Sequence, residues 1–244
     1  MKYEKSGKYT KNENIANNHD SHAGPGGLQL AEFLAEKMAL ESGKKLIDIG
    51  FYRGHQTCFL AKEYGVNIVG IDPGGTIDGY TYGIEPLMEN ARKFGVEDKI
   101  LGIGVGVPNT HLPNNHFDYA YVTTCLEMLR RYQGSEGYIA ALKEIHRIIK
   151  CGAVLGLAEP MCLDMPVPEC CKKHNFDKCF ATAEVTRKAV AEAGFTILES
   201  GYCEDAREWW LEHGAKSDDP NYQKDIELMV ESDWLSFGYV LAKK

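Results

Sequence analysis

The chain has 244 residues, of which 44% are apolar and 25% are charged, fractions typical of a globular domain. Its net charge of −8 argues against a surface built to bind phosphate backbones, so nucleic acid is not an expected partner. No apolar run reaches the ~20 residues that span a bilayer, and residues 1–20 lack the apolar stretch of a secretory signal. We therefore expect a cytoplasmic protein with no membrane partner.

The chain begins with a polar leader, residues 1–27, which ends in a Gly-Pro-Gly-Gly cluster and is predicted to be irregular. Residues 28–40 carry apolar side chains at helical spacing, and Ser42-Gly43 ends that helix. Tyr9 and His22 are the leader residues that we consider as candidate bases, because a phenol or imidazole can accept a proton from a nucleophile.

Apolar runs then alternate with amphipathic segments to the end of the chain. The predicted strands cover residues 45–49, 67–71, 99–105, 119–123, 153–158, 195–199 and 235–242, and the predicted helices cover residues 56–64, 84–94, 137–149 and 182–193. Steady alternation of this kind predicts an α/β fold. We expect one Rossmann-like domain over residues 1–244, with a seven-stranded, mostly parallel sheet and helices on both faces.

Two features at the ends of the first two strands indicate a nucleoside site. The first strand runs into a turn that carries Gly50 and Gly54 and opens the next helix, a geometry that aims backbone N–H groups at a ligand. The second strand ends in Asp72, 22 residues after Gly50. An acidic residue at that place can accept both hydroxyls of a ribose.

These residues resemble the cofactor motif of class I S-adenosylmethionine-dependent methyltransferases of the small-molecule type. The resemblance rests first on Asp48-Ile49-Gly50, Gly54 and Gly70-Ile71-Asp72. It continues through Leu-Pro and Phe-Asp at residues 112–118, Leu-Glu-Met-Leu at residues 126–129, and the helix and turn at residues 142–152. It covers roughly residues 44–160, and the last two predicted strands fit the antiparallel pair that closes the family's sheet.

The resemblance implies that S-adenosyl-L-methionine is the cofactor and that its methyl group passes to a small-molecule acceptor. It places the cofactor core at residues 44–160, a cap and helix at residues 1–43, and substrate-side cap insertions at residues 161–180 and 205–233. The residues expected to contact the cofactor are Asp48, Gly50, Tyr52, Gly54, Asp72, Pro73, Asn109 and Thr123. Two departures stand out, because Tyr52 replaces the family's middle glycine, and Pro108 stands where an acidic residue often contacts adenine.

Several alternatives stay open. Tyr52 and the lack of an evident catalytic base allow a protein that binds S-adenosylmethionine without turnover. A dinucleotide-dependent oxidoreductase is disfavoured, because Tyr52 breaks the Gly-x-Gly-x-x-Gly pattern of such enzymes. Arg53 is equally consistent with a partner for a ligand carboxylate and with a solvated loop residue.

Cysteines and tryptophans in the later segments allow further interpretations. Thiols at residues 162, 170, 171 and 179 could serve an arsenic or thiol methyltransferase, although no Cys-x-x-Cys pair is present and we expect no metal site. Trp209 and Trp210 could wall a pocket or pack in a homodimer; adjacent helical residues point to different sides, so at most one is expected to face a pocket.

Overall fold

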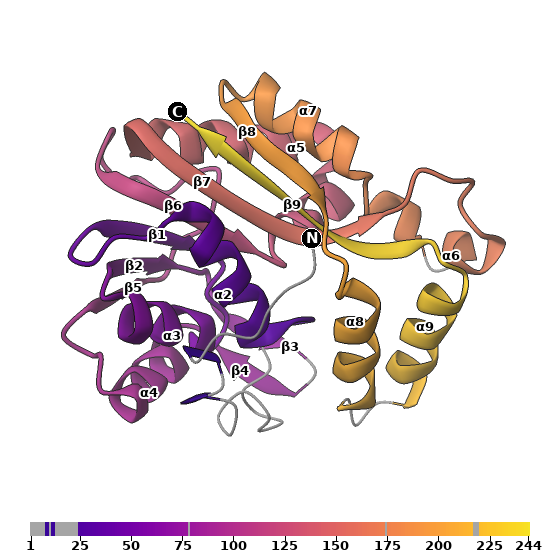
Figure 1. The fold of residues 1–244 in the computed structure, drawn as a ribbon, viewed down its shortest axis with the longest axis horizontal. Coiled ribbons are helices and arrows are strands. Elements are labelled where there is room, and N and C mark those ends of the chain that lie inside the picture. The colour runs from indigo at the N-terminus through magenta and orange to yellow at the C-terminus, as the bar shows by residue number, and fades with distance from the viewer. Residues whose placement is uncertain (1–7, 10, 13–23, 78, 174, 217–219) are drawn as a thin grey trace.

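The fold centres on a seven-stranded sheet, which Figure 1 shows as a ribbon. A computed structural model describes residues 8–9, 11–12, 24–77, 79–173, 175–216 and 220–244 of the chain. Across the sheet the strands are β5 (Ile100–Ile103), β2 (Asn67–Ile71), β1 (Lys45–Ile49), β6 (Phe117–Thr123), β7 (Ile149–Cys162), β9 (Leu235–Lys243) and β8 (Thr196–Tyr202). The first five are parallel, and β9 runs antiparallel to β7 and β8. The predicted Rossmann-like sheet is therefore confirmed.

The register of the central strands places the carboxyl ends of β1, β2 and β6, where the nucleoside site was predicted, at one level. In the β1–β2 pair, Ile49 lies opposite Ile71, so Gly50 and Asp72 leave neighbouring strands at the same level. In the β1–β6 pair, Ile49 lies opposite Val122. These short strands are buried on both faces, as their continuous apolar runs indicated.

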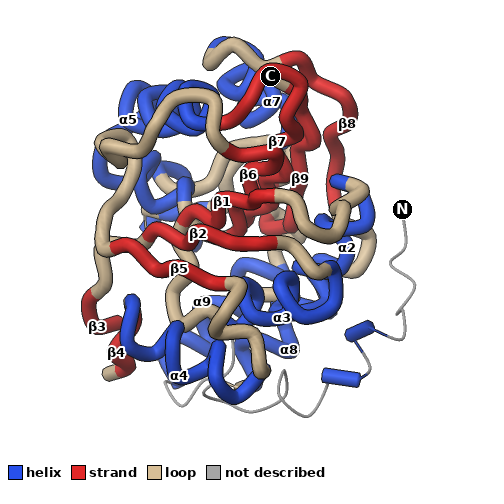
Figure 2. Tube along the Cα trace, turned by 90° about the vertical axis from the view of Figure 1, so that its left-hand side faces the viewer, coloured by secondary structure: helices blue, strands red, loops and turns tan. Residues whose placement is uncertain are grey.

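Helices cover both faces of the sheet, as Figure 2 shows. One face carries α2 (Gly27–Met38), α3 (His55–Tyr64) and α4 (Ile84–Phe94), and the other carries α5 (Leu126–Ile148) and α7 (Ala183–Glu192). The prediction for α5 was too short, since the helical segment begins at residue 126 instead of 137. Gly134 interrupts it with non-helical backbone (φ 67°, ψ −168°), and that break obscured the helical period in the sequence.

Inserted elements gather at the carboxyl ends of the parallel strands. A hairpin of β3 (Gly75–Ile77) and β4 (Tyr80–Tyr82), which was not predicted, follows β2. The helices α8 (Ala206–Ala215) and α9 (Pro220–Glu231) lie side by side between β8 and β9 (Figure 1). The β7–α7 connection (residues 163–182) carries α6 (Glu169–Lys173) and the 3₁₀ helix η2 (Phe176–Lys178). Within the described part of the chain, no helix is long and apolar enough to cross a membrane.

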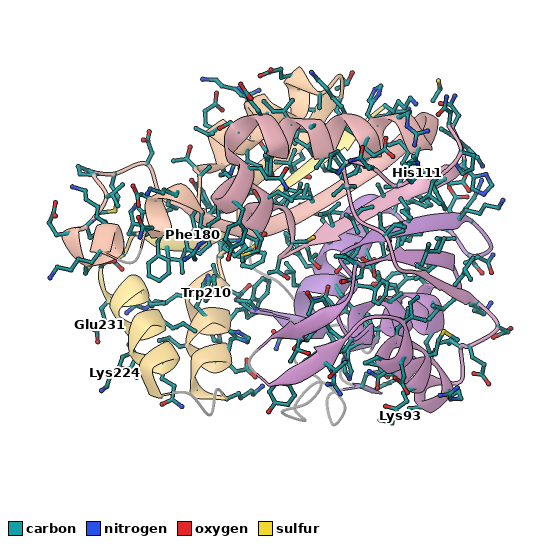
Figure 3. The ribbon with its side chains drawn as sticks, turned by 180° about the vertical axis from the view of Figure 1, so that it is seen from behind. Lys93, His111, Phe180, Trp210, Lys224 and Glu231 are labelled. Carbon is teal, nitrogen blue, oxygen red and sulfur yellow. The ribbon has the colours of Figure 1, made fainter. Side chains whose placement is uncertain are left out.

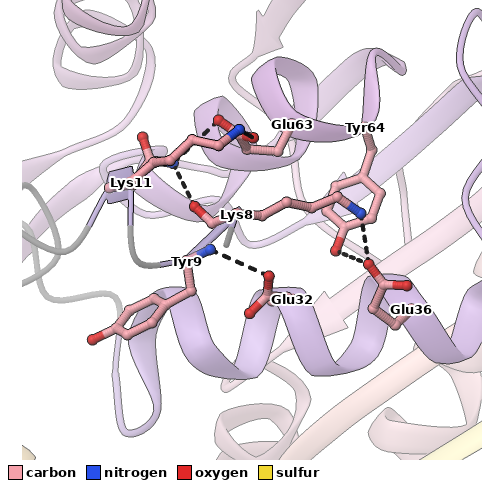
Figure 4. A network of polar contacts seen from close by, with 8 residues as sticks. Lys8, Tyr9, Lys11, Glu32, Glu36, Glu63 and Tyr64 are labelled. Atoms are coloured by element: carbon pink, nitrogen blue, oxygen red, sulfur yellow. Dashed lines mark hydrogen bonds and ion pairs between the residues drawn. The ribbon is translucent and has the colours of Figure 1, made fainter. Parts of the chain in front are cut away.

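The described leader residues are fixed to α2 and α3 by polar contacts (Figure 4). The Tyr9 amide donates to Glu32 Oε1 over 3.2 Å, and its phenol, which is buried, accepts from Gln29 Nε2 over 3.1 Å. The lysines on either side form ion pairs, Lys8 with Glu36 at 2.7 Å and Lys11 with Glu63 at 3.0 Å. Tyr9 thus packs against α2 as part of the core.

We expect Tyr9→Ala to lower the free energy of unfolding by about 3 kcal/mol, because it removes a buried ring and a buried hydrogen bond. Tyr132→Ala is the matched control, since the Tyr132 side chain is 73% exposed. That control should change stability by no more than about 0.5 kcal/mol. Urea unfolding of the three proteins measures both values, and equal effects of the two substitutions would contradict the docking of the leader.

Candidate active site

The turn between β1 and α3 uses left-handed backbone at three positions, Gly50 (φ 79°), Tyr52 (φ 53°) and Gly54 (φ 80°). A Cβ on Gly50 would lie 2.8 Å from the Cβ of Cys125 and closer still to its Sγ. Only glycine therefore lets this turn contact the residue that precedes α5. The turn ends at Gly54, the N-cap of α3, so the first N–H groups of that helix face the carboxyl edge of the sheet.

Asp72 lies beside this turn, as its spacing predicted. Its Oδ2 accepts from the Tyr52 amide at 2.9 Å, and its Oδ1 accepts from the Gly74 amide at 2.8 Å. The carboxyl group is buried, which raises its pKa, and the two amide hydrogen bonds act in the opposite direction. Each carboxylate oxygen keeps a further lone pair, so the group is oriented and can still accept hydrogen bonds from a ribose.

The unpredicted hairpin packs directly on the turn. The rings of Tyr52 and Tyr82 are 5.3 Å apart, and the Gly83 amide donates to the Tyr52 carbonyl over 3.0 Å. Arg53 donates through Nη1 to the Thr81 carbonyl over 3.2 Å. These contacts give Arg53 a structural role in holding the hairpin against the turn, and they make Tyr52 part of an aromatic wall beside Asp72.

Asp48 lies beneath the turn and faces α3. Its Oδ2 accepts from Thr57 Oγ1 at 2.6 Å, and burial together with the charge of Asp72 raises its pKa to about 7. Thr123, at the end of β6, donates to Gln56 Oε1 over 2.6 Å. The structure thus uses Asp48 and Thr123 to fix the start of α3, and it adds Gln56, which sequence patterns did not single out.

Pro73 and the loop after β5 lie on the opposite side of Asp72. A Cβ on Gly106 would contact Pro73 Cδ at 3.6 Å, and the Asp72 amide donates to the Ile103 carbonyl over 3.2 Å. Asn109 is exposed and follows a cis peptide bond between Val107 and Pro108. The loop that was expected to border adenine therefore lies next to the expected ribose contact.

The end of the leader reaches the same edge of the sheet. A Cβ on Gly24 would contact Thr124 at 3.0 Å, and a Cβ on Gly26 would contact Trp209 at 2.9 Å. The Trp209 indole donates to Gln29 Oε1 over 3.1 Å, so α2 and α8 are joined there. His22, the other candidate base, lies outside the described residues.

Both tryptophans of α8 are buried within the chain. Their indole rings are each 6.4 Å from the ring of Phe237, and Trp210 Nε1 donates to the Ser236 carbonyl over 3.2 Å. Their exposed fractions are 2% for Trp209 and 4% for Trp210, so the interpretation of these indoles as a dimer contact is not supported.

The four cysteines of the 162–179 segment do not converge. Cys170 and Cys171 are neighbours with their sulfurs 3.9 Å apart, whereas Cys162 contacts the Phe180 carbonyl at 3.9 Å and Cys179 the Glu127 carbonyl at 3.6 Å. Among the described residues, no group of three or more His, Cys, Asp or Glu side chains could hold a metal ion. This arrangement gives no support to an arsenic site shared by the four thiols.

The structure brings together a buried polar cluster where α5, β7 and α7 meet, and this cluster was not predicted from the sequence. It consists of Glu127, Arg130 and Tyr138 from α5, Glu159 from β7 and Thr186 from α7. Tyr138 donates to Glu159 Oε1 over 2.7 Å, and Arg130 Nη2 lies 3.8 Å from the same oxygen. One signal in the sequence could have indicated this cluster, namely Glu159 inside the apolar strand β7. A glutamate is rarely buried without a partner, so its position predicts a polar neighbour.

Comparison with known proteins supports the resemblance that the motifs indicated. No protein-family model matches the chain. The chain is 27% identical over 132 residues to a sterol 24-C-methyltransferase (erg6) of Aspergillus fumigatus, and 28% identical over 96 residues to phosphoethanolamine N-methyltransferase 1 of Arabidopsis thaliana. These matches cover 54% and 39% of this chain but only 32% and 18% of the relatives' own lengths.

Solved structures share the fold over nearly the whole chain. The [4+2]-cyclase SpnF superposes with a TM-score of 0.77 at 17% identity and covers 97% of this chain and 94% of its own. Geranyl diphosphate methyltransferase, solved in complex with S-adenosylmethionine, superposes with a TM-score of 0.69 at 13% identity over 89% of this chain and 85% of its own. The resemblance to class I S-adenosylmethionine-dependent methyltransferases is thus confirmed in sequence and in fold.

Proposed function

We propose that the protein binds S-adenosylmethionine at the turn of residues 50–54 and transfers its methyl group to a small molecule. The observation that carries this proposal is the Asp72 carboxylate, which two backbone amides fix beside a turn of left-handed residues at the carboxyl edge of a parallel sheet. Ligands of such sheets bind at this edge. The sequence similarity to sterol and phosphoethanolamine methyltransferases supports the same function.

The residues present fit the cofactor. Asp72 would accept the ribose hydroxyls, Gly50 and Gly54 would let the ligand approach the backbone, and Pro73 and Asn109 would border the adenine. The Tyr52 ring stands against Tyr82, where it would flank the methionine end. When bound, S-adenosylmethionine supplies an electrophilic methyl group. The chain contributes position, orientation and exclusion of water, which are large terms in such a transfer.

A small acceptor is favoured by the elements around this edge. The end of the leader contacts Thr124 and Trp209 at this edge, and Trp209 of α8 donates to Gln29 of α2. Cys179 of the β7–α7 connection contacts the Glu127 carbonyl at the start of α5. We propose that these segments cap an acceptor of small-molecule size. A cytoplasmic location, the lack of nucleic-acid and membrane partners, and a homodimer remain predictions.

A second candidate is a protein of this fold that does not transfer methyl groups. The superposition on a [4+2]-cyclase over 97% of the chain shows that the same fold carries a different activity. Tyr52 in place of glycine is consistent with this candidate, as it is with binding without turnover. A methyltransferase consumes S-adenosylmethionine in the presence of an acceptor. A protein of this fold with another activity, or one that binds the cofactor without turnover, does not.

The cofactor site is tested by titration calorimetry with S-adenosylhomocysteine. Hydrogen bonds to a charged group contribute about 1.5–3 kcal/mol each, so Asp72→Ala should weaken binding at least about tenfold. Asp98→Ala removes an exposed aspartate and should leave the affinity within twofold, serving as the control. Unchanged affinity of the Asp72 variant would remove this residue from the site, and a wild-type protein that binds no S-adenosylhomocysteine would overturn the proposed function.

A further inference from the structure

The buried cluster of Glu127, Arg130, Tyr138, Glu159 and Thr186 contains polar atoms to which none of the described residues forms a hydrogen bond. All five side chains are less than one-tenth exposed. Hydrogen bonds within the cluster converge on one atom, Glu159 Oε1, which accepts from Tyr138 at 2.7 Å and from Thr186 at 3.5 Å. The Arg130 guanidinium stacks on the Tyr138 ring, 3.8 Å from its centroid, so that its plane is fixed.

Four atoms of the cluster have no hydrogen-bond partner among the described residues, namely Arg130 Nε, Arg130 Nη2, Glu127 Oε2 and Glu159 Oε2. Leaving a buried polar group unpaired costs about 1–3 kcal/mol, and more for a charged group. The two nitrogens form one edge of the guanidinium, the edge that donates two parallel hydrogen bonds. The cluster therefore has hydrogen-bonding capacity at Arg130, Glu127 and Glu159 that the described residues do not use.

This cluster borders the proposed cofactor site. Glu127 follows the end of β6 by four residues, and the intervening Cys125 packs against Gly50. Burial raises the pKa of the Cys125 thiol well above its usual value, and the charges of Glu127 and Asp72 both add to that rise. The Cys125 thiol thus interacts electrostatically both with Asp72, the proposed ribose contact, and with Glu127 of the cluster.

The donor and acceptor inventory selects the group that fits. An ammonium has no lone pair to accept from Arg130, and a carboxylate has no hydrogen to donate to Glu127. A hydroxyl does both, because its oxygen accepts from the guanidinium edge while its hydrogen is donated to a carboxylate.

We propose, on the basis of the proposed function, that Glu127 and Arg130 bind the hydroxyl of a small acceptor and that the enzyme is an O-methyltransferase. In the transfer, Glu127 acts in its ionised form, which the folded protein gains as the pH rises toward about 8, because burial and the charge of Glu159 raise the pKa of this group. The O–H bond of the acceptor breaks, and its proton passes to this carboxylate. The oxygen lone pair forms the new bond to the methyl carbon, and the breaking carbon–sulfur bond leaves its electron pair on sulfur as a neutral thioether. Arg130 stabilises the negative charge that develops on the oxygen.

The β7–α7 connection contacts the cluster side of α5. Its described contacts with the cluster side include two thiol contacts, Cys179 Sγ to the Glu127 carbonyl at 3.6 Å and Cys162 Sγ to the Phe180 carbonyl at 3.9 Å. Backbone hydrogen bonds hold both ends of the connection, because the Cys162 amide donates to the Ala181 carbonyl over 3.1 Å and the Leu163 amide donates to the Trp234 carbonyl over 2.8 Å. Phe180, which lies in this connection, is labelled in Figure 3.

The test uses phenol, benzylamine and benzoate as probes with the full-length protein. With S-adenosylmethionine, phenol should be methylated to anisole at least about a hundredfold faster than benzylamine or benzoate is methylated. Glu127→Gln should lower the phenol rate at least about a hundredfold, the usual contribution of a general base. Glu136→Gln, an exposed glutamate on α5, is the control and should leave that rate unchanged.

Binding measurements separate this inference from the proposed function. Arg130→Gln should weaken phenol binding to the S-adenosylhomocysteine-loaded protein at least tenfold, while every variant should bind S-adenosylhomocysteine within twofold of wild type. The hydroxyl site is overturned if phenol does not bind the loaded protein, if benzylamine or benzoate is preferred, or if both variants act on phenol as wild type does. Failure of the wild type to bind S-adenosylhomocysteine would instead remove the proposed function.

Discussion

Replacing Gly50 with alanine is expected to abolish measurable binding of S-adenosylhomocysteine and to lower the free energy of unfolding by about 3 kcal/mol. The residue has a φ of 79°, which costs an alanine roughly 1–2 kcal/mol. The new Cβ would also lie 2.8 Å from the Cβ of Cys125, and such overpacking adds about 1–3 kcal/mol. Relief of this overlap must move the turn or the start of α5, and both border the proposed ligand site.

Gly43→Ala provides the matched control for this substitution. Gly43 has a φ of 81°, but a Cβ there would meet nothing within 4 Å, so the variant carries the backbone strain without the overlap. It should lose about 1–2 kcal/mol and keep full affinity for S-adenosylhomocysteine. The double variant Gly50→Ala with Cys125→Gly should recover part of the stability. Urea unfolding measures the free energy of unfolding of each variant, and calorimetry measures its affinity for S-adenosylhomocysteine. Equal losses of stability and of affinity in the two single variants would show that the contact with Cys125 is unimportant.

The stability of the protein should fall between about pH 5 and pH 9 because of Glu127. Burial and the charge of Glu159 raise the pKa of Glu127 to about 8, against 4.5 for an ordinary glutamate. Below pH 4.5 both the folded and the unfolded states hold the proton, and the folded state is not penalised. As the pH rises toward 8 only the unfolded state has lost the proton, so ionisation favours unfolding by about 1.4 kcal/mol for each unit of pKa difference.

The groups that face Glu127 set the size of this effect. Glu159 on β7 acts in the same direction, since burial raises its pKa to about 7, while Arg130 on α5 opposes both shifts. The thiols of Cys125 and Cys179 have raised pKa values and stay neutral in this range. Glu127→Gln, which cannot ionise, should therefore match wild type at pH 5 and exceed its stability by a few kcal/mol at pH 9.

Urea unfolding at the two pH values measures this difference, with Glu136→Gln as the control because its side chain is exposed. The control should follow the wild-type pH dependence throughout. If Glu127→Gln lost stability between pH 5 and pH 9 as steeply as wild type, the buried carboxyl would not be the titrating group.

The class of fold could be predicted because it depends on local patterns. Continuous apolar runs marked β1 and β2 with their observed bounds, and the alternation with amphipathic helices fixed the layered arrangement. Gly50 and Asp72 could be paired in advance for the same reason, since parallel strands of equal length bring their carboxyl ends to one edge.

The sequence by itself therefore determined the sheet, the turn and the acidic residue of the proposed cofactor site, because hydrophobic period and glycine placement act over a few residues. Only the tertiary structure decided that the Tyr52 ring packs on the β3–β4 hairpin, that Tyr9 is buried against α2, and that the indoles of α8 lie inside the chain. It also joined Glu127 and Arg130 of α5 with Glu159 of β7. These contacts link residues 20 or more positions apart, and no local pattern encodes which buried charges will meet or how far burial shifts their protonation.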